Sequence, residues 1–184
     1  GDKNFNLRTT LRGGSFDLIN PSIVWEQRWN NRVTSSVSAD FTDASGKYKF
    51  RYRRLLPSGE VAWDTTAVRQ NGDIQSYRVE ATIFGNTSDG TWNAKAYYYD
   101  SERGIPGAIV NNVWKHAQRQ WDRNFFLQGY WTKYVSEKYR FQVSGKFALD
   151  RMRYLNPDSA LMYQDNRFNQ KELYLSTAHY YEIL

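Results

Sequence analysis

Two stretches of the chain combine charged and aromatic residues in a way that could bind an anionic ligand. The first, residues 43–73, holds Arg51, Arg53, Trp63 and Asp64. Guanidinium groups donate paired hydrogen bonds to carboxylate, phosphate or catecholate oxygens, so this stretch could grip a ligand that carries such groups. Residues 48–54 alternate in polarity before a Pro-Ser-Gly turn, which predicts an extended hairpin. The alternative is a solvated hairpin whose charges only keep it soluble.

The second stretch, residues 103–120, holds Arg103, Trp114, His116 and Arg119. Its Gly-Ile-Pro-Gly segment predicts a constrained turn, and residues 112–122 could form a short helix. These side chains could shape the mouth of a substrate site. The alternative is that the loop simply packs over the edge of the fold.

Other kinds of chemistry find little support in the sequence. His116 and His179 are the only histidines, cysteine is absent, and no metal-ligand spacing occurs. There is no Gly-x-Ser-x-Gly elbow, phosphate loop or HExxH motif, so we expect neither an enzyme nor a cofactor. Basic charge together with many aromatic residues is a feature of proteins that bind nucleic acid. Here, however, the cations are dispersed and no nucleic-acid motif is present. We therefore expect no nucleic-acid partner.

The composition is that of one β-rich domain. The chain has 184 residues, a formal net charge of +6, 14 tyrosines, 10 phenylalanines and 7 tryptophans. Aromatic side chains favour strands, because they fit a pleated, half-buried surface. The sequence contains no apolar run long enough for a transmembrane helix and no signal-peptide pattern.

Polarity alternates with a period of two along most of the chain, which indicates strands. In residues 139–149, Tyr139, Phe141, Val143 and Phe147 fall on one side, with Arg140, Gln142, Ser144 and Lys146 on the other. The same pattern occurs in residues 5–12, 19–26, 33–41, 76–83, 92–98 and 172–183, and less cleanly in 124–135. The fold predicted is all-β: an antiparallel up-and-down meander of about eight strands, part of or curled into a β-barrel.

The connections alternate between tight turns and long loops. Tight turns are predicted at residues 30–32, 87–90 and 136–138, and the longer connections at 43–73, 103–120 and 154–170; Gly13-Gly14 is a short first turn on the long-loop side. One rim of the meander would therefore carry short turns and the other long loops. Large aromatic residues stand beside the tight turns: Trp25, Trp29, Phe84, Trp92, Tyr134 and Tyr139.

Short turns on one rim, long loops on the other and aromatic rings near the turns are typical of a transmembrane barrel. The alternation itself is equally compatible with a soluble barrel that turns its apolar face inward. A lipocalin-like ligand-binding barrel and a carbohydrate-binding β-sandwich therefore stay open as alternatives. The direction in which Ile23, Val79, Phe141, Val143 and Phe147 point would separate these classes.

Several segments resemble the barrel region of TonB-dependent outer-membrane receptors of the Bacteroidetes type. They are Gly14-Ser15-Phe16, the tract 97–108 with its Ser-Glu-Arg-Gly-Ile-Pro-Gly stretch, and residues 114–126. The resemblance covers the whole chain. It implies an outer-membrane location and active import of a scarce nutrient of the siderophore, cobalamin or glycan class.

The resemblance also implies a parent with an N-terminal plug inside a barrel of about 22 strands. Residues 1–184 would be one barrel segment, the strands that follow the plug, without the plug or the remaining strands. External loops would capture the nutrient, TonB would act through the plug, and membrane lipid would contact the barrel wall. As an isolated piece, the chain would be prone to self-association through its edge strands.

Overall fold

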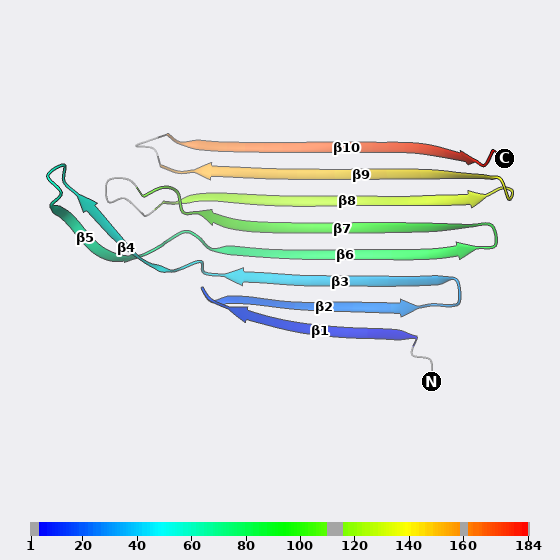
Figure 1. Cartoon of the computed structure of the whole chain (residues 1–184), viewed down its shortest axis with the longest axis horizontal. Coiled ribbons are helices and arrows are strands. Elements are labelled where there is room, and N and C mark those ends of the chain that lie inside the picture. The colour runs from blue at the N-terminus through cyan, green and yellow to red at the C-terminus, as the bar shows by residue number, and fades with distance from the viewer. Residues whose placement is uncertain (1–3, 110–115, 159–161, 184) are drawn as a thin grey trace.

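The computed structural model describes residues 4–109, 116–158 and 162–183 of the chain (Figure 1). Eight strands form one antiparallel sheet in the order β1-β2-β3-β6-β7-β8-β9-β10. Their bounds are β1 Phe5–Gly14, β2 Leu18–Arg28, β3 Val33–Ala44, β6 Ile74–Thr87, β7 Gly90–Ile105, β8 Gln118–Tyr134, β9 Tyr139–Asn156 and β10 Gln164–Tyr181. Neighbours in the sheet are also neighbours along the chain except where β4 and β5 are inserted, so the predicted all-β meander is confirmed.

Strands β4 (Lys49–Leu55) and β5 (Val61–Val68) form a separate antiparallel hairpin between β3 and β6. The hairpin extends past the end of the main sheet (Figure 1). The extended hairpin expected within residues 43–73 is therefore present, although the prediction of eight strands did not count its two strands.

The tight β2–β3, β6–β7 and β8–β9 turns lie at one rim of the sheet, and the longer connections lie at the other together with the short β1–β2 turn, as Figure 1 shows. The β2–β3 turn is closed by Asn30, whose side-chain oxygen accepts hydrogen bonds from the backbone N–H groups of Arg32 and Val33 at 2.8 and 2.9 Å. This is the Asx geometry expected of asparagine in a turn. The rim with tight turns is called the turn rim below, and the opposite one the loop rim.

Several predicted boundaries are wrong. The first turn lies at residues 15–17 rather than at Gly13-Gly14, which still pair with Ile19 and Leu18 of β2. Strands β7 to β10 extend into the predicted loops, because their polar ends stay hydrogen-bonded in the ladder. The predicted helix over 112–122 is wrong for residues 118–122, which belong to β8; residues 112–115 lie outside the described residues.

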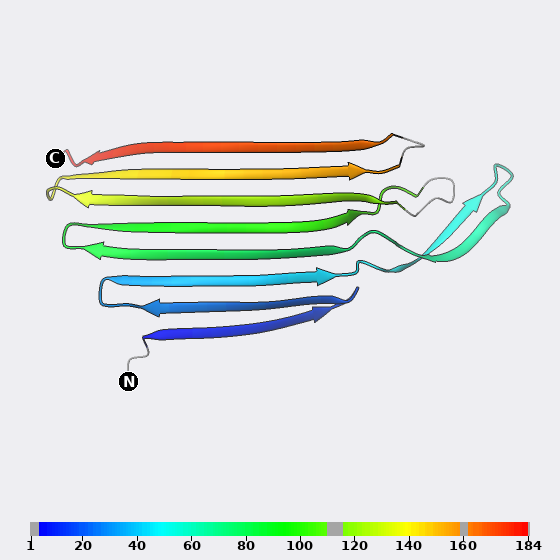
Figure 2. The same cartoon turned by 180° about the vertical axis from the view of Figure 1, so that it is seen from behind.

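The sheet is a single layer with two chemically different faces. Its register places the apolar positions of all eight strands on one side, called the apolar face, and most charged positions on the other, called the polar face. Neither face of the main sheet is covered by another element, as the front and back views show (Figures 1 and 2). Among the described hydrophobic residues only Ala148 is fully buried, at 5% exposure.

The sheet is open, because β1 and β10 form its two edges. Each edge strand therefore has one side without a ladder partner among the described strands. No helix within the described ranges is long and apolar enough to cross a membrane.

Candidate functional site

The apolar face carries a continuous band without charged side chains, called the apolar band. On β8 the band lies between Lys133 near the turn rim and Arg123 toward the loop rim, about 34 Å apart along the strand. At the tilt of about 40° found in membrane barrels, this length spans about 26 Å. Its members are Phe5, Leu7, Thr9, Leu11, Ile19, Pro21, Ile23, Trp25, Gln27, Val33, Ser35, Val37, Ala39, Phe41, Tyr77, Val79, Ala81, Ile83, Gly85, Trp92, Ala94, Ala96, Tyr98, Phe125, Leu127, Gly129, Trp131, Tyr139, Phe141, Val143, Gly145, Phe147, Leu149, Leu173, Leu175, Thr177, His179 and Tyr181.

Aromatic rings concentrate at both ends of this band. Near the turn rim, Trp131 and Phe141 make an edge-to-face pair with centroids 5.4 Å apart. Toward the loop rim, Phe41 and Tyr77 stack at 6.0 Å. Rings at the boundary between lipid and water form girdles in membrane barrels.

Sequence reasoning pointed to rings near the turn rim, but it missed the second row, which follows only from the register. It also grouped together rings that the sheet separates. Phe84 and Tyr134 lie on the polar face, whereas Trp25, Trp92 and Tyr139 lie on the apolar face.

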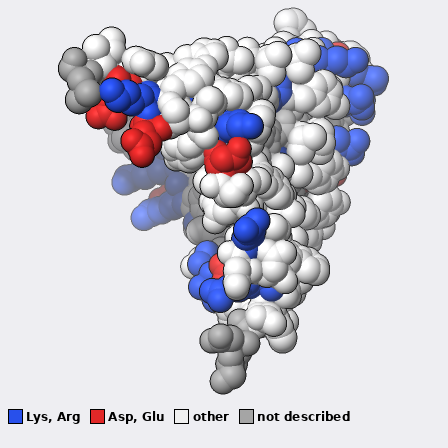
Figure 3. All heavy atoms as spheres, turned by 90° about the vertical axis from the view of Figure 1, so that its right-hand side faces the viewer, with Lys and Arg blue, Asp and Glu red and all other residues white. Residues whose placement is uncertain are grey.

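The polar face pairs its charges and amides with one another. Lys95 lies 3.0 Å from the Glu80 carboxylate, and Asn124 donates to Asp150 at 2.7 Å. Seven cations that alternation assigned to polar positions all lie on this face: Arg8, Arg12, Arg28, Arg78, Lys95, Arg140 and Lys146. Seen from the turn rim, most of the surface is uncharged, with Lys and Arg atoms both at its margins and in its middle (Figure 3).

The hairpin β4–β5 brings three of the predicted ligand-binding residues together. Arg51 donates to both carboxylate oxygens of Asp64, at 2.8 and 2.5 Å, and Arg53 is the cross-strand neighbour of Asp64. These hydrogen bonds lower the pKa of Asp64 below its usual value, so the carboxylate stays ionised. Trp63 is the cross-strand neighbour of Arg54. Both lie on the face of the hairpin opposite to that of Arg51 and Arg53.

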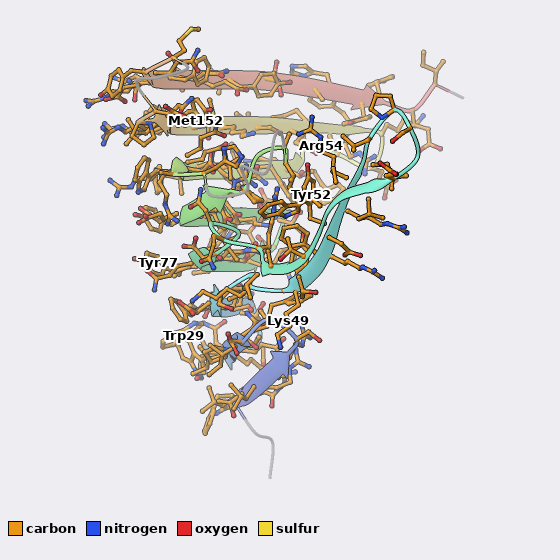
Figure 4. The ribbon with its side chains drawn as sticks, turned by 90° about the vertical axis from the view of Figure 1, so that its left-hand side faces the viewer. Trp29, Lys49, Tyr52, Arg54, Tyr77 and Met152 are labelled. Atoms are coloured by element: carbon orange, nitrogen blue, oxygen red, sulfur yellow. The ribbon has the colours of Figure 1, made fainter. Side chains whose placement is uncertain are left out.

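The hairpin leans toward one side of the sheet. Viewed from the loop rim, Tyr52 and Arg54 lie on the side away from Tyr77, a residue of the apolar face (Figure 4). The hairpin therefore extends beyond the polar face. Its exposed cations Lys49 and Arg53 have no ion-pair partner among the described residues.

Arg119 joins two connections at the loop rim. It donates to Asp73 at 2.7 Å and to Glu102 at 2.7 Å, with its side chain 23% exposed. Asn71 reinforces this junction, because its side-chain nitrogen donates to the carbonyls of Ile105 and Gln118 at 3.1 and 2.7 Å. With both carboxylates engaged, Arg119 acts as a structural tie between the segment before β6 and the ends of β7 and β8.

The other predicted site residues of the second stretch lie in different places. His116 lies with Arg119 on an open hollow of about 590 Å³ at the loop rim, and its Nε2 is 2.8 Å from the carbonyl oxygen of Ala108. Arg103 is exposed on the polar face and does not line that hollow. Trp114 lies outside the described residues. The structure thus unites His116 with Arg119, but not with the Arg51–Asp64 pair.

Arg69 could not be identified from the sequence. It is 6% exposed and donates from its Nη2 to the carbonyl oxygen of Gly107. The burial of a single arginine depends on tertiary contacts, so the spacing of residues along the sequence does not indicate it. Within the described ranges no group of three or more His, Cys, Asp or Glu residues converges to hold a metal ion.

No protein-family model matches the chain, and no curated protein matches it either. The function is therefore inferred from the chemistry of the two faces and the two rims.

Proposed function

We propose that this chain forms part of the wall of an outer-membrane β-barrel, with its apolar face toward lipid and its polar face toward an aqueous passage. The observation that carries the proposal is the apolar band, because the charged residues of the apolar face lie only at its two ends. They are Lys133 near the turn rim and, from Asp43, Asp100, Arg123, Arg151 and Lys171 onward, those toward the loop rim. The band's span of about 26 Å is close to the apolar band of about 25 Å on membrane barrels.

Exposure of the band supports the same assignment. Leu7, Leu127 and Leu175 are 54%, 49% and 75% exposed. Covering a leucine-sized side chain contributes about 1.5–3 kcal/mol, so an uncovered face of this size needs an apolar environment. Lipid supplies that environment without a second protein layer. A lipocalin-like barrel or a β-sandwich would instead require the same side chains to pack against protein.

We further propose that the parent is a nutrient importer of the TonB-dependent receptor class. The supporting features are the resemblance of residues 97–108 and 114–126 and the contrast between the two rims. In such a receptor the hairpin β4–β5 would be an external arm over the mouth, and its cations Lys49 and Arg53 suit an anionic nutrient. The plug, TonB and the remaining strands would belong to the parent.

The two edges of the sheet agree with this placement. Strands β1 and β10 each leave one row of backbone N–H and C=O groups without a ladder partner in the part of the chain that the structure describes. In a membrane such groups must be paired, which a closed barrel does. Further barrel strands would pair them in the parent, and a second copy could do so in the isolated chain.

A flotation experiment tests the membrane assignment. The refolded chain is mixed with phosphatidylcholine vesicles and centrifuged in a density gradient, together with the variants Val143→Arg and Ser144→Arg. These neighbours lie on opposite faces of β9, so the two variants carry the same charge at almost the same depth. An arginine on the lipid side costs about 2–4 kcal/mol near the midplane. We expect the wild type and Ser144→Arg to float and Val143→Arg to float far less; equal behaviour of the two variants would refute the proposal.

A further inference from the structure

A cluster of cations lies on the apolar face at the loop-rim end of the apolar band, where Lys171 is directly opposite Leu149 and the other four cations lie farther toward the loop rim. Its members come from three neighbouring strands: Arg123 on β8, Arg151 and Arg153 on β9, and Arg167 and Lys171 on β10. Arg123 is the direct cross-strand neighbour of Arg151, and Arg153 that of Arg167. Like charges directly opposite each other destabilise a sheet unless anions compensate them.

The protein itself supplies only part of that compensation. Asp100 accepts from Arg123 at 2.7 Å, and Asp165 accepts from Arg153 at 2.9 and 3.0 Å, with Arg167 3.5 Å away. Arg151 and Lys171 are exposed and have no ion-pair partner among the described residues. Five cations therefore face two carboxylates.

The charges are also layered. The guanidinium-bearing side chains of Arg123 and Arg167 are 57% and 66% exposed, whereas those of Asp100 and Asp165 are only 22% and 21% exposed. The carboxylates lie beneath and the cations outermost, so an approaching group meets positive charge. A hollow of about 320 Å³ over these strands is lined by four arginines and two carboxylates. Its lining residues are Arg123, Arg151, Arg153, Arg167, Asp100, Asp122, Trp121, Met152 and Asn169. Arg153 lies over the Trp121 ring at 5.1 Å, which fixes one wall.

The depth of the cluster indicates which anion it meets. Arg123 and Arg151 are two residues beyond Phe125 and Leu149, the last band members on their strands, which places them about 7 Å outside the band along the strand. Phosphate groups of lipids lie in a layer about 5–8 Å thick just outside the hydrocarbon core. The other end of the apolar band on β8, near the turn rim, differs from this cluster, because its cation Lys133 is paired with Asp89 at 3.4 Å.

We propose that the cluster formed by Arg123, Arg151, Arg153, Arg167 and Lys171 is a binding site for the phosphate of a lipid headgroup in the leaflet at the loop rim. Guanidinium groups pair with phosphate oxygens in bidentate fashion, and the apolar band beside them receives the acyl chains. This inference rests on the proposed orientation of the apolar face toward lipid.

The test measures the apparent Kd of the whole chain for phosphatidic acid, in non-ionic detergent micelles with phosphatidylcholine as competitor, by native mass spectrometry. The variant is Arg151→Gln with Arg167→Gln. It leaves Asp100 on Arg123 and Asp165 on Arg153, so each carboxylate keeps one arginine partner, although Asp165 loses the longer contact with Arg167. The matched control is Arg8→Gln with Arg12→Gln, two exposed arginines on the polar face of β1.

We expect about fivefold weaker binding for each cluster cation removed, and so about 25-fold for the pair, with the control unchanged. Equal Kd values in all three proteins would overturn the site. Displacement by inorganic phosphate, beyond that by chloride at equal ionic strength, would show a site for free phosphate rather than for lipid. If the wild type retains phosphatidylcholine without preferring phosphatidic acid, only this inference fails. If it retains neither lipid, the proposed orientation fails as well.

Discussion

At the scale of single residues, the loop-rim arginines divide into those engaged by carboxylates and those left exposed. Arg119 is held by Asp73 and Glu102, and Arg51 by Asp64. Arg53 is left as an exposed cation beside the Arg51–Asp64 pair. We infer that Arg119 fixes the geometry of the rim, whereas Arg53, which has no carboxylate partner among the described residues, is available to a ligand.

The Arg51–Asp64 pair gives a prediction about pH. Hydrogen bonds from Arg51 hold the pKa of Asp64 below the usual carboxyl value of about 3.9. The pair therefore stabilises the hairpin above that pH and is lost as the pH falls through the lowered pKa. In an NMR titration of the Asp64 carboxyl carbon, Arg51→Gln should move the midpoint upward. Arg54→Gln, on the other side of the hairpin, is the matched control and should leave it in place; an unmoved midpoint in Arg51→Gln would contradict the account.

At the scale of elements, the turn rim depends on close packing between strands and rings. Gly85 on β6 is directly opposite Trp92 on β7, and a Cβ atom at residue 85 would overlap the indole ring. A glycine opposite an aromatic residue lets the ring lie across the neighbouring strand. At Gly145, also in the apolar band, a Cβ atom would lie 3.8 Å from Leu175 and from the Tyr174 carbonyl oxygen, which is ordinary van der Waals contact.

This contrast gives a matched pair of substitutions. Gly85→Val should lower the free energy of unfolding by about 1–3 kcal/mol, because the side chain must displace Trp92. Gly145→Val should have a much smaller effect, since the added Cβ makes only ordinary contacts with Leu175 and Tyr174. Urea unfolding of both variants in the same vesicles, followed by circular dichroism, gives the comparison. An equal loss of stability in the two variants would mean that Trp92 does not lie over Gly85.

Much of this architecture could be predicted from the sequence, and the misses have physical causes. Residues 139–149 alternate so regularly that only a strand separates their apolar and polar sides. The positions of the strand ends were harder to predict, because residues 150–156 and 164–172 are mostly polar on both faces. These residues form strands because they pair with neighbouring strands in the ladder. The predicted helix failed at residues 118–122 for the same reason, since β7 and β9 pair with them on both sides.

The candidate site was less accessible to sequence reasoning than the fold. Arg51, Arg53 and Asp64 are close in a hairpin, so their juxtaposition follows from alternation and one turn. Arg123, Arg151 and Arg167 lie on three strands, and no local pattern indicates that they meet. Their cluster depends on the register of β8, β9 and β10, which only the folded sheet fixes.

At the scale of the whole molecule, the account makes one claim: the apolar face lies against lipid and the polar face against water. Because the chain has no cysteine, single-cysteine variants along β9 can be spin-labelled without removing native thiols. The measurement is the accessibility of labels at residues 141–149, in reconstituted vesicles, to dissolved oxygen and to a water-soluble nickel chelate.

The account predicts a strict period of two. Labels at Phe141, Val143, Gly145, Phe147 and Leu149 should be relaxed by oxygen, which concentrates in lipid, and labels at the four residues between them by the nickel chelate. If the odd-numbered labels are instead shielded from both reagents, the apolar side chains pack against protein in a dry interior, and the membrane-wall account is wrong.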